Sequence, residues 1–358
     1  MIVDATGRAK DQLEKIITSG QAQASRLMDR INTELPVDVI APAPLLEAVV
    51  VESQLRLRNP RFEYDLHRNA RNQMMTKLGF PGRYADDLMG FRQGWANNLL
   101  ELNLNELLDH DSSKYLIRSV DNQARGFLSD RYRRLDGRPI LDAVLESTES
   151  FGAVPISGIV SDLSFALKLA LPHVYEALPG QPFVYWLEIS TSNYGTKKVS
   201  ISNGITVLVC LNGAKGDEFF GQRHLGRQMP EDIEMSQETM RLDTAWTVSA
   251  MRDVVAGTFA PQHAEALCKR IQGANDRKLD RKTFVERVKK LGLTKEESEK
   301  ASTLYSLQDV EFLPPGDTYW KGSNVISHMA VNTKDGDRRL ELEEVAGWLL
   351  RGHAPAMA

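Results

Sequence analysis

The sequence predicts an α+β fold, in which an antiparallel β-sheet is backed by helices and followed by a helical C-terminal part. Residues 155–213 alternate apolar and polar side chains in runs separated by turn residues, which is typical of strands. Residues 236–256 repeat apolar side chains at helical spacing, so a helix follows these strands in a β-β-β-α order. Beyond Gly257 the segments become helical and charged. The expected domains are an N-terminal amphipathic helix (1–35), an α+β core (36–258) and a helical region (259–358).

The N-terminal helix, expected over residues 6–32, has one apolar stripe, which needs a surface to pack against. Its own domain is the favoured surface, and a neighbouring subunit is the alternative. After the proline-rich linker 34–44, the next elements are strand-like runs at 48–57 and 61–66 and helices at 68–78 and 90–108. In the last of these helices, a buried stripe is expected at Phe91, Trp95, Leu99 and Leu102.

The sheet itself is expected to be a meander. A half-buried strand carries Leu163, Phe165, Leu167 and Leu169 on one face, and a second strand carries Tyr185, Leu187 and Ile189 opposite Trp186, Glu188 and Ser190. An Asn193-Tyr194-Gly195 turn leads back through residues 197–201, and a separate apolar strand spans 205–211. The covering helix faces the sheet with Leu242, Trp246, Ala250 and Val254. Later elements are helices at 262–272, 280–291 and 294–306, a loop-rich stretch at 314–337 and a short helix at 342–350.

Composition narrows the class of protein. The 358 residues are 42% hydrophobic and 26% charged, as in ordinary globular proteins. No run approaches the ~20 apolar residues that cross a bilayer, and the N-terminus lacks a secretory layout, so we expect a cytoplasmic protein that contacts no membrane. Cys210 and Cys268 stand alone, which argues against a disulfide framework and a zinc site. The net charge of -4 argues against coating duplex DNA by bulk charge, although a local basic groove is compatible with it.

Several segments carry a family resemblance. They are MMTKLGFPGRYADDL (74–88), ANNLLELNLNELL (96–108), YLIRSV (115–120), RGFLSDRYRRLD (125–136) and LVCLNG (208–213), the last followed by Arg223 and His224. In this order they resemble the phage- and plasmid-borne family known as domain of unknown function 932. The resemblance implies a mobile element in a bacterial host cell and no particular reaction. The β-β-β-α order is also similar to the core of Rad-type and RecT-like single-strand annealing proteins, which hold one DNA strand in a basic groove between sheet and helices.

An arginine-rich segment is the first candidate for phosphate binding. It combines Phe127, Tyr132 and an Asp136-Gly137 turn with six arginines, which are Arg118, Arg125, Arg131, Arg133, Arg134 and Arg138. Guanidinium groups bind phosphate bidentately, and aromatic rings stack on bases. A salt-bridged hairpin, in which Asp121, Asp130 and Asp136 orient the arginines, explains the same pattern.

Two further groups extend this candidate interface. Lys197 and Lys198 beside Tyr194 are placed to follow a sugar-phosphate backbone or to protect a sheet edge, and Arg223, His224 and Arg227 continue the track. Residues 269–290 hold nine cations against three carboxylates, a net charge of +6. Within them, Arg277, Lys278, Arg281, Lys282, Lys289 and Lys290 form an expected accessory patch. A solvated helical face is the bland explanation of that patch.

Catalytic templates are not found in the sequence. It has no phosphate-binding loop, dinucleotide fingerprint, nucleophile elbow or zinc helix, and a calcium loop around Gly336 would begin at Val331 and end at Leu342, which cannot ligate the ion. We therefore expect no cofactor, no metal and no catalysis. If the protein is an enzyme, the minimal site that the sequence offers is His224 with Asp217 or Glu218.

The leading hypothesis is a phage or plasmid protein that binds single-stranded DNA, with RNA as the alternative ligand, and promotes strand annealing in recombination or replication as a homo-oligomer. Arg125, Arg131, Arg133 and Arg134 would hold phosphates, and Tyr132 would stack. This requires guanidinium groups that line a shared, solvent-open trough and are not neutralised by carboxylates. The alternatives are a self-assembling or anti-defence interaction protein and a nucleic-acid-processing enzyme.

Overall fold

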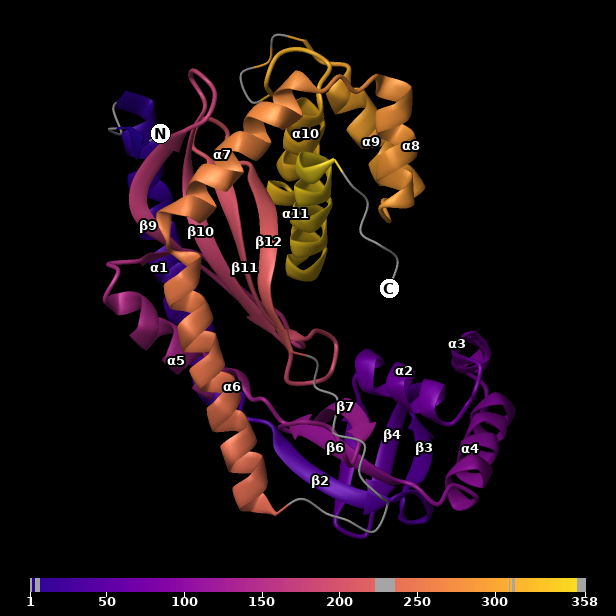
Figure 1. The fold of residues 1–358 in the computed structure, drawn as a ribbon. Coiled ribbons are helices and arrows are strands. Elements are labelled where there is room, and N and C mark those ends of the chain that lie inside the picture. Colours follow the sequence, from indigo (N-terminus) through magenta and orange to yellow (C-terminus); the bar gives the residue numbers. More distant parts are fainter. Residues whose placement is uncertain (1, 4–6, 223–235, 309, 311–312, 353–358) are drawn as a thin grey trace.

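The α+β fold expected from the sequence is confirmed, and it contains two six-stranded sheets (Figure 1). The computed structural model describes residues 2–3, 7–222, 236–308, 310 and 313–352. The large sheet has the order β1-β9-β10-β11-β12, with β8 pairing β9, and all of its pairs are antiparallel. Its strands are β1 (Ile2–Val3), β8 (Val154–Val160), β9 (Phe165–Glu176), β10 (Pro182–Thr191), β11 (Val199–Val207) and β12 (Gly213–Gln222).

The small sheet precedes most of the large one in sequence and has the order β2-β6-β7-β5-β4-β3. Its strands are β2 (Val37–Pro42), β3 (Glu47–Val51), β4 (Gln54–Asn59), β5 (Phe62–Leu66), β6 (Lys114–Val120) and β7 (Gln123–Ser129). The single strand expected at 48–57 is instead the β3–β4 hairpin, because Glu52 and Ser53 both take positive φ and reverse the chain. Helices α2 (Arg68–Lys77), α3 (Gly82–Phe91) and α4 (Gly94–Asp109) accompany this sheet.

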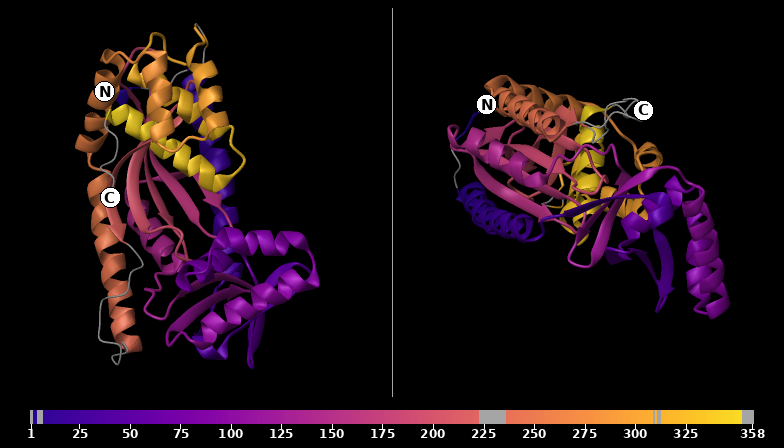
Figure 2. Two further views of the ribbon diagram at one scale, coloured as in Figure 1. Left: turned by 90° about the vertical axis from the view of Figure 1, so that its right-hand side faces the viewer. Right: turned by 90° about the horizontal axis from the view of Figure 1, so that it is seen from below.

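Helices cover both faces of the large sheet, as the view from below shows (Figure 2). On one side lie α5 (Gly137–Glu149), α6 (Gln237–Thr258) and α7 (Pro261–Asp276), and the Tyr185 hydroxyl donates to the Thr258 carbonyl at 2.8 Å. On the other side lie α1 (Gly7–Thr33), α10 (Tyr319–Val331) and α11 (Gly336–Arg351). The half-buried strand expected around Leu167 is therefore buried on both faces, including Ala166 and Lys168.

The apolar stripe of α1 packs on its own chain, as favoured from the sequence. A side chain at Gly20 would lie 2.4 Å from the backbone of Ile156, so glycine allows the helix to approach β8 closely. Within the described residues, no helix combines the length and apolar content that crossing a membrane requires.

The end of the meander differs from the sequence-based expectation. The separate strand expected at 205–211 does not form, because β11 ends at Val207 and Leu211 takes a positive φ of 58° in the turn that follows. The chain then returns as β12, which the sequence did not indicate. Leu208 is fully buried, so the apolar run reflects the burial of a turn.

Two predicted helix stripes are wrong by a fraction of a turn. In α4 the buried residues are Ala96, Leu100, Leu104 and Leu108, whereas Trp95 and Leu102 are 54% and 59% exposed, and Phe91, which ends α3, is 54% exposed. In α6 the face toward the sheet carries Thr247, Met251 and Val255, whereas Leu242 and Trp246 are 54% and 61% exposed. In both helices a small residue, Ala96 or Thr247, occupies the inward position next to an outward tryptophan.

The stretch expected to be a loop at 314–337 contains helix α10, and the short helix expected at 342–350 is the longer α11. Helix α10 is buried on nearly every side, because apolar residues such as Trp320 and Val325 and small or polar residues such as Gly322 and Ser327 are all buried. A helix buried all round shows no amphipathic stripe, so its sequence does not give the usual signal. The remaining helices, α8 (Arg281–Lys290) and α9 (Lys295–Tyr305), lie where they were expected.

Candidate nucleic-acid interface

The hairpin between β10 and β11 joins the two sheets. Asn69 and Gln73 of α2 donate to the Tyr194 carbonyl at 3.4 and 2.9 Å, and Arg118 of β6 donates to the Asn193 carbonyl at 2.8 Å. Gly195 takes a positive φ of 76°, as the turn requires. Because Tyr194 is only 4% exposed, the aromatic ring expected to contact nucleic acid is part of this joint.

Arg118 is the central ion-pairing group of the joint. Its side chain is 1% exposed and forms ion pairs of 2.7 Å with both Asp38 of β2 and Asp136 at the start of α5. Burial lowers the pKa of this guanidinium, but the two carboxylates raise the pKa by more, so it stays above the ordinary value. Arg118 therefore holds two sheets and a helix together and is closed to a phosphate ligand.

Most of the other arginines of this segment are also paired with carboxylates, and all of these pairs except the one within α5 join different parts of the chain. Arg125 pairs with Glu34 at 2.5 Å, Arg134 with Asp38 at 3.4 Å and Arg138 with Asp142 at 2.8 Å. Arg133 pairs with Asp243 of α6 and donates to Thr247 Oγ1 at 2.6 Å.

The other members of the arginine-rich candidate are Arg131, Tyr132 and Phe127, the last of which is fully buried. Arg131 is exposed, and no described carboxylate forms an ion pair with it. Tyr132 is largely buried, and this burial raises the pKa of its hydroxyl. The solvent-open trough on which the leading hypothesis depended is therefore not formed by these side chains.

The lysines after the hairpin pair with carboxylates too. Lys197 contacts Asp337 at the start of α11 at 2.7 Å, and Lys198 contacts Glu218 of β12 at 2.6 Å. Burial raises the pKa of Asp337, but Lys197 and Ser164 lower it by more, so this carboxylate is held ionised. These ion pairs connect the β10–β11 turn to α11 and to the edge strand β12.

The remaining part of the predicted track, Arg223, His224 and Arg227, lies outside the described residues. The acids considered as partners of His224 are engaged elsewhere. Asp217 pairs with Arg270 at 2.6 Å, and Glu218 pairs with Lys198. No cluster of three or more His, Cys, Asp or Glu suited to a metal ion occurs in the part of the chain that the structure describes.

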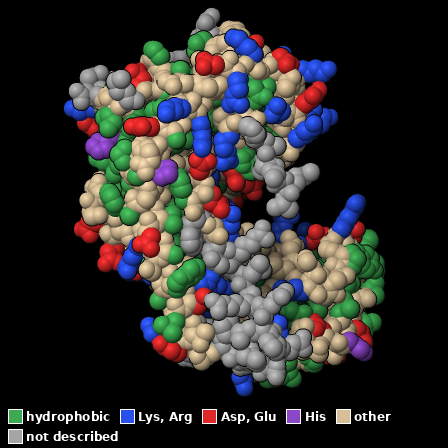
Figure 3. Space-filling view, viewed as in Figure 1, with side chains coloured by type: hydrophobic (Ala, Val, Ile, Leu, Met, Phe, Trp, Pro, Cys, Tyr) green, Lys and Arg blue, Asp and Glu red, His purple; other side chains and the backbone are tan. Residues whose placement is uncertain are grey.

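The accessory patch has a different character. Lys278, Lys282, Lys289 and Lys290 are exposed on and beside α8, and among the described residues none of them forms an ion pair with a carboxylate. We call these four lysines the α8 surface. Lys and Arg side chains gather in this region, at the upper right of the space-filling view (Figure 3).

The arginines beside the α8 surface make neutral contacts. Arg281 donates to Ser302 Oγ at 2.9 Å, and Arg277 and Arg287 lie over the ring of Tyr319 at 4.8 and 5.2 Å from its centroid. Within the described part of the chain, no carboxylate forms an ion pair with these guanidinium groups, so they add to the positive potential of the α8 surface.

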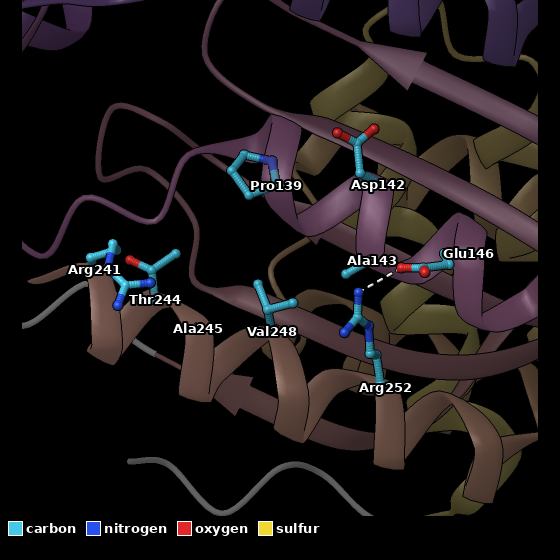
Figure 4. A pocket seen from close by; sticks show the side chains of 9 residues that line it. All are labelled: Pro139, Asp142, Ala143, Glu146, Arg241, Thr244, Ala245, Val248 and Arg252. Carbon is cyan, nitrogen blue, oxygen red and sulfur yellow. Dashed lines mark hydrogen bonds and ion pairs between the residues drawn. The ribbon is translucent and has the colours of Figure 1, made fainter.

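The groove between α5 and α6, about 420 Å³ in volume, is a poor alternative site (Figure 4). Arg252 on one wall pairs with Glu146 on the other at 2.5 Å, and Asp142 is taken by Arg138. Its charges cancel internally, and nothing in its lining selects a ligand charge.

A buried charged cluster under α11 is a feature that sequence reasoning missed. Glu188 of β10 is 1% exposed and lies 3.0 Å from Lys215 and 3.8 Å from Lys168, which also pairs with Glu343 of α11. The sequence signal for this cluster is the position of one charged residue, Lys168 or Glu188, within the apolar run of each of two strands. Because α11 encloses the cluster, we assign it to fold stability.

Comparison with protein-family models, with curated proteins and with solved structures finds no significant match for this chain. The resemblance to domain of unknown function 932 and to the single-strand annealing proteins therefore stays a prediction.

Proposed function

We propose that this protein binds nucleic acid through the α8 surface. The observation that supports the proposal is the contrast in pairing. The arginines around Tyr132 are mostly neutralised, whereas the four lysines of the α8 surface have no carboxylate partner among the described residues. Lysine ammonium groups free of internal partners attract phosphates and release counterions on binding. The principal contact with nucleic acid is therefore proposed at the α8 surface, and not at the arginines around Tyr132.

The proposal needs no catalysis, nucleotide or metal, since phosphate contacts alone position a strand. Its specific form is the one expected from the sequence: single-stranded DNA, or RNA, held by a homo-oligomer that presents bases for annealing in phage or plasmid recombination. The net charge of -4 fits a protein that binds along one basic surface and repels nucleic acid elsewhere.

The salt dependence of binding tests the proposal. The triple variant Lys282→Gln, Lys289→Gln, Lys290→Gln is expected to bind a labelled 20-nucleotide strand more weakly. The log-log slope of affinity against salt should become shallower by about 2, because each phosphate contact on a single strand contributes about 0.7. Equilibrium titration by fluorescence anisotropy across a salt series measures both quantities.

The matched control is Lys10→Gln, Lys15→Gln, Lys334→Gln, which removes the same charge from exposed positions on α1 and before α11. We expect it to keep the wild-type slope. Equal effects of the two triple variants, or no retained strand at low ionic strength, would refute binding through the α8 surface.

The exposed apolar residues of α3 and α4 favour a second candidate function, self-assembly. Phe91 and Trp95 lie with ring centroids 5.2 Å apart, and Leu102 follows one heptad after Trp95 on the same side of α4. Helix α4 carries three carboxylates and no cation, whereas α8 carries five cations and one carboxylate. These helices are complementary in charge, so the partner we propose is a second copy of this chain, whose α8 surface would face α4.

Light scattering after size-exclusion chromatography tests self-assembly without nucleic acid. We expect wild-type protein to assemble at low salt and Leu102→Lys to remain monomeric, because the new ammonium group would face the lysines of the α8 surface. Leu242→Lys, at a similarly exposed leucine on α6, is the control and should assemble normally. A wild-type monomer at every concentration would exclude this candidate.

A further inference from the structure

A groove between α8 and α11 combines an apolar floor with a rim that carries two cations and one carboxylate. It has a volume of about 370 Å³, its floor is formed by Leu291, Trp348 and Leu349, and its rim includes Glu286, Arg287 and Lys290. This volume lies in the range of small-molecule sites. The groove opens beside the lysines of the α8 surface, so a chain lying on that surface passes over it.

The residues of α8 that line the groove lie on a different face of the helix from those that pack in the core. Phe284 and Val288 point into the core, while Glu286, Arg287 and Lys290 line the side toward α11 at helical spacing. Trp348 reaches the groove from α11 and is half-buried, so its indole is held by the core and still offers a surface. Arg287 is also fixed from below by the ring of Tyr319.

We propose that this groove takes one unpaired nucleobase, stacked against Trp348, with the adjoining phosphates on Arg287 and Lys290. This inference rests on the proposed function. A planar ring and a phosphate in one ligand match an indole and two cations in one groove, and aromatic stacking tolerates every base. The Glu286 carboxylate is an acceptor for the N–H groups on a base edge. A base inside a duplex cannot enter, so the groove selects single strands.

Three labelled probes of equal length test the inference: a single strand of thymidines, an abasic strand and a duplex. Wild-type protein is expected to bind the thymidine strand roughly tenfold more tightly than the abasic strand, the effect of stacking about one base. Trp348→Leu should abolish this preference and leave affinity for the abasic strand and the duplex unchanged. Trp246→Leu, at an exposed tryptophan on α6, is the matched control.

A second variant guards against misfolding of Trp348→Leu, which circular dichroism would reveal. Thr283→Leu narrows the groove from the surface of α8 without deleting a core side chain or adding an aromatic ring, and it should remove the same preference. Equal wild-type affinity for thymidine and abasic strands, or a preference that survives both variants, overturns the base site while phosphate binding by α8 stands. Failure to bind any probe overturns the proposed function itself.

Discussion

Replacement of Arg118 by methionine is expected to lower the free energy of unfolding by about 3–5 kcal/mol, the cost of removing one partner from a buried ion pair. Arg118 is 1% exposed and neutralises Asp38 and Asp136 at once, so methionine would leave two carboxylates at the joint without their main counter-charge. The Asn193 carbonyl would also lose its donor. Urea denaturation followed by circular dichroism measures the change, with the slope checked for constancy.

Arg138→Met is the appropriate control, because its ion pair with Asp142 is about half exposed on both sides. We expect a loss below about 1 kcal/mol there, as for other surface pairs. A loss at Arg118 no larger than at Arg138 would show that the joint does not depend on this arginine. Restoration of stability by adding Asp38→Asn and Asp136→Asn to Arg118→Met would assign the loss to uncompensated charge.

Helices with one apolar stripe could be predicted from the sequence because periodicity is a local property. The extents of α1, α2, α6, α8 and α9 follow from it within a few residues, and so do the two faces of β10. Helix α10 could not be recognised, since burial on all sides removes the stripe. The predicted inward faces of α4 and α6 are wrong because exposed apolar residues such as Trp95 and Trp246 cannot be distinguished by residue type from buried ones.

The predicted arginine site is wrong because charges counted within one segment do not show which carboxylates the fold brings to it. Glu34 lies 91 residues from Arg125, Asp38 lies 80 from Arg118, and Asp243 lies 110 from Arg133. Of the nearby aspartates counted against these arginines, only Asp136 pairs with one of them in the described residues. The positive charge counted for residues 269–290 agrees better with the surface of α8, because no carboxylate in the described residues pairs with its lysines. Charge density within a segment therefore indicates a binding surface only when the fold brings no counter-charge to it.

The buried cluster under α11 gives the second large expected effect, through Glu188→Gln. This substitution keeps the shape of the side chain but removes the charge that lies between Lys215 and Lys168, both largely buried. We expect the free energy of unfolding at pH 7 to fall by about 3–5 kcal/mol, because two ammonium groups would lose their shared carboxylate. Glu218→Gln, whose pair with Lys198 is exposed, should cost less than about 1 kcal/mol.

The pH dependence distinguishes this explanation from a simple packing defect. Burial raises the pKa of Glu188, but Lys215 and Lys168 lower it by more, so its pKa in the folded protein is below the ordinary 4.5. Below that ordinary value the unfolded chain binds more protons than the folded one. The contribution of Glu188 is therefore complete above pH 4.5 and is lost as the pH falls through the lowered pKa. Urea denaturation of wild type and Glu188→Gln from pH 7 down to pH 3 measures this contribution. We expect the difference in the free energy of unfolding between the two proteins to shrink below pH 4.5. A difference that stays constant with pH would mean that Glu188 contributes through its shape and not through its charge.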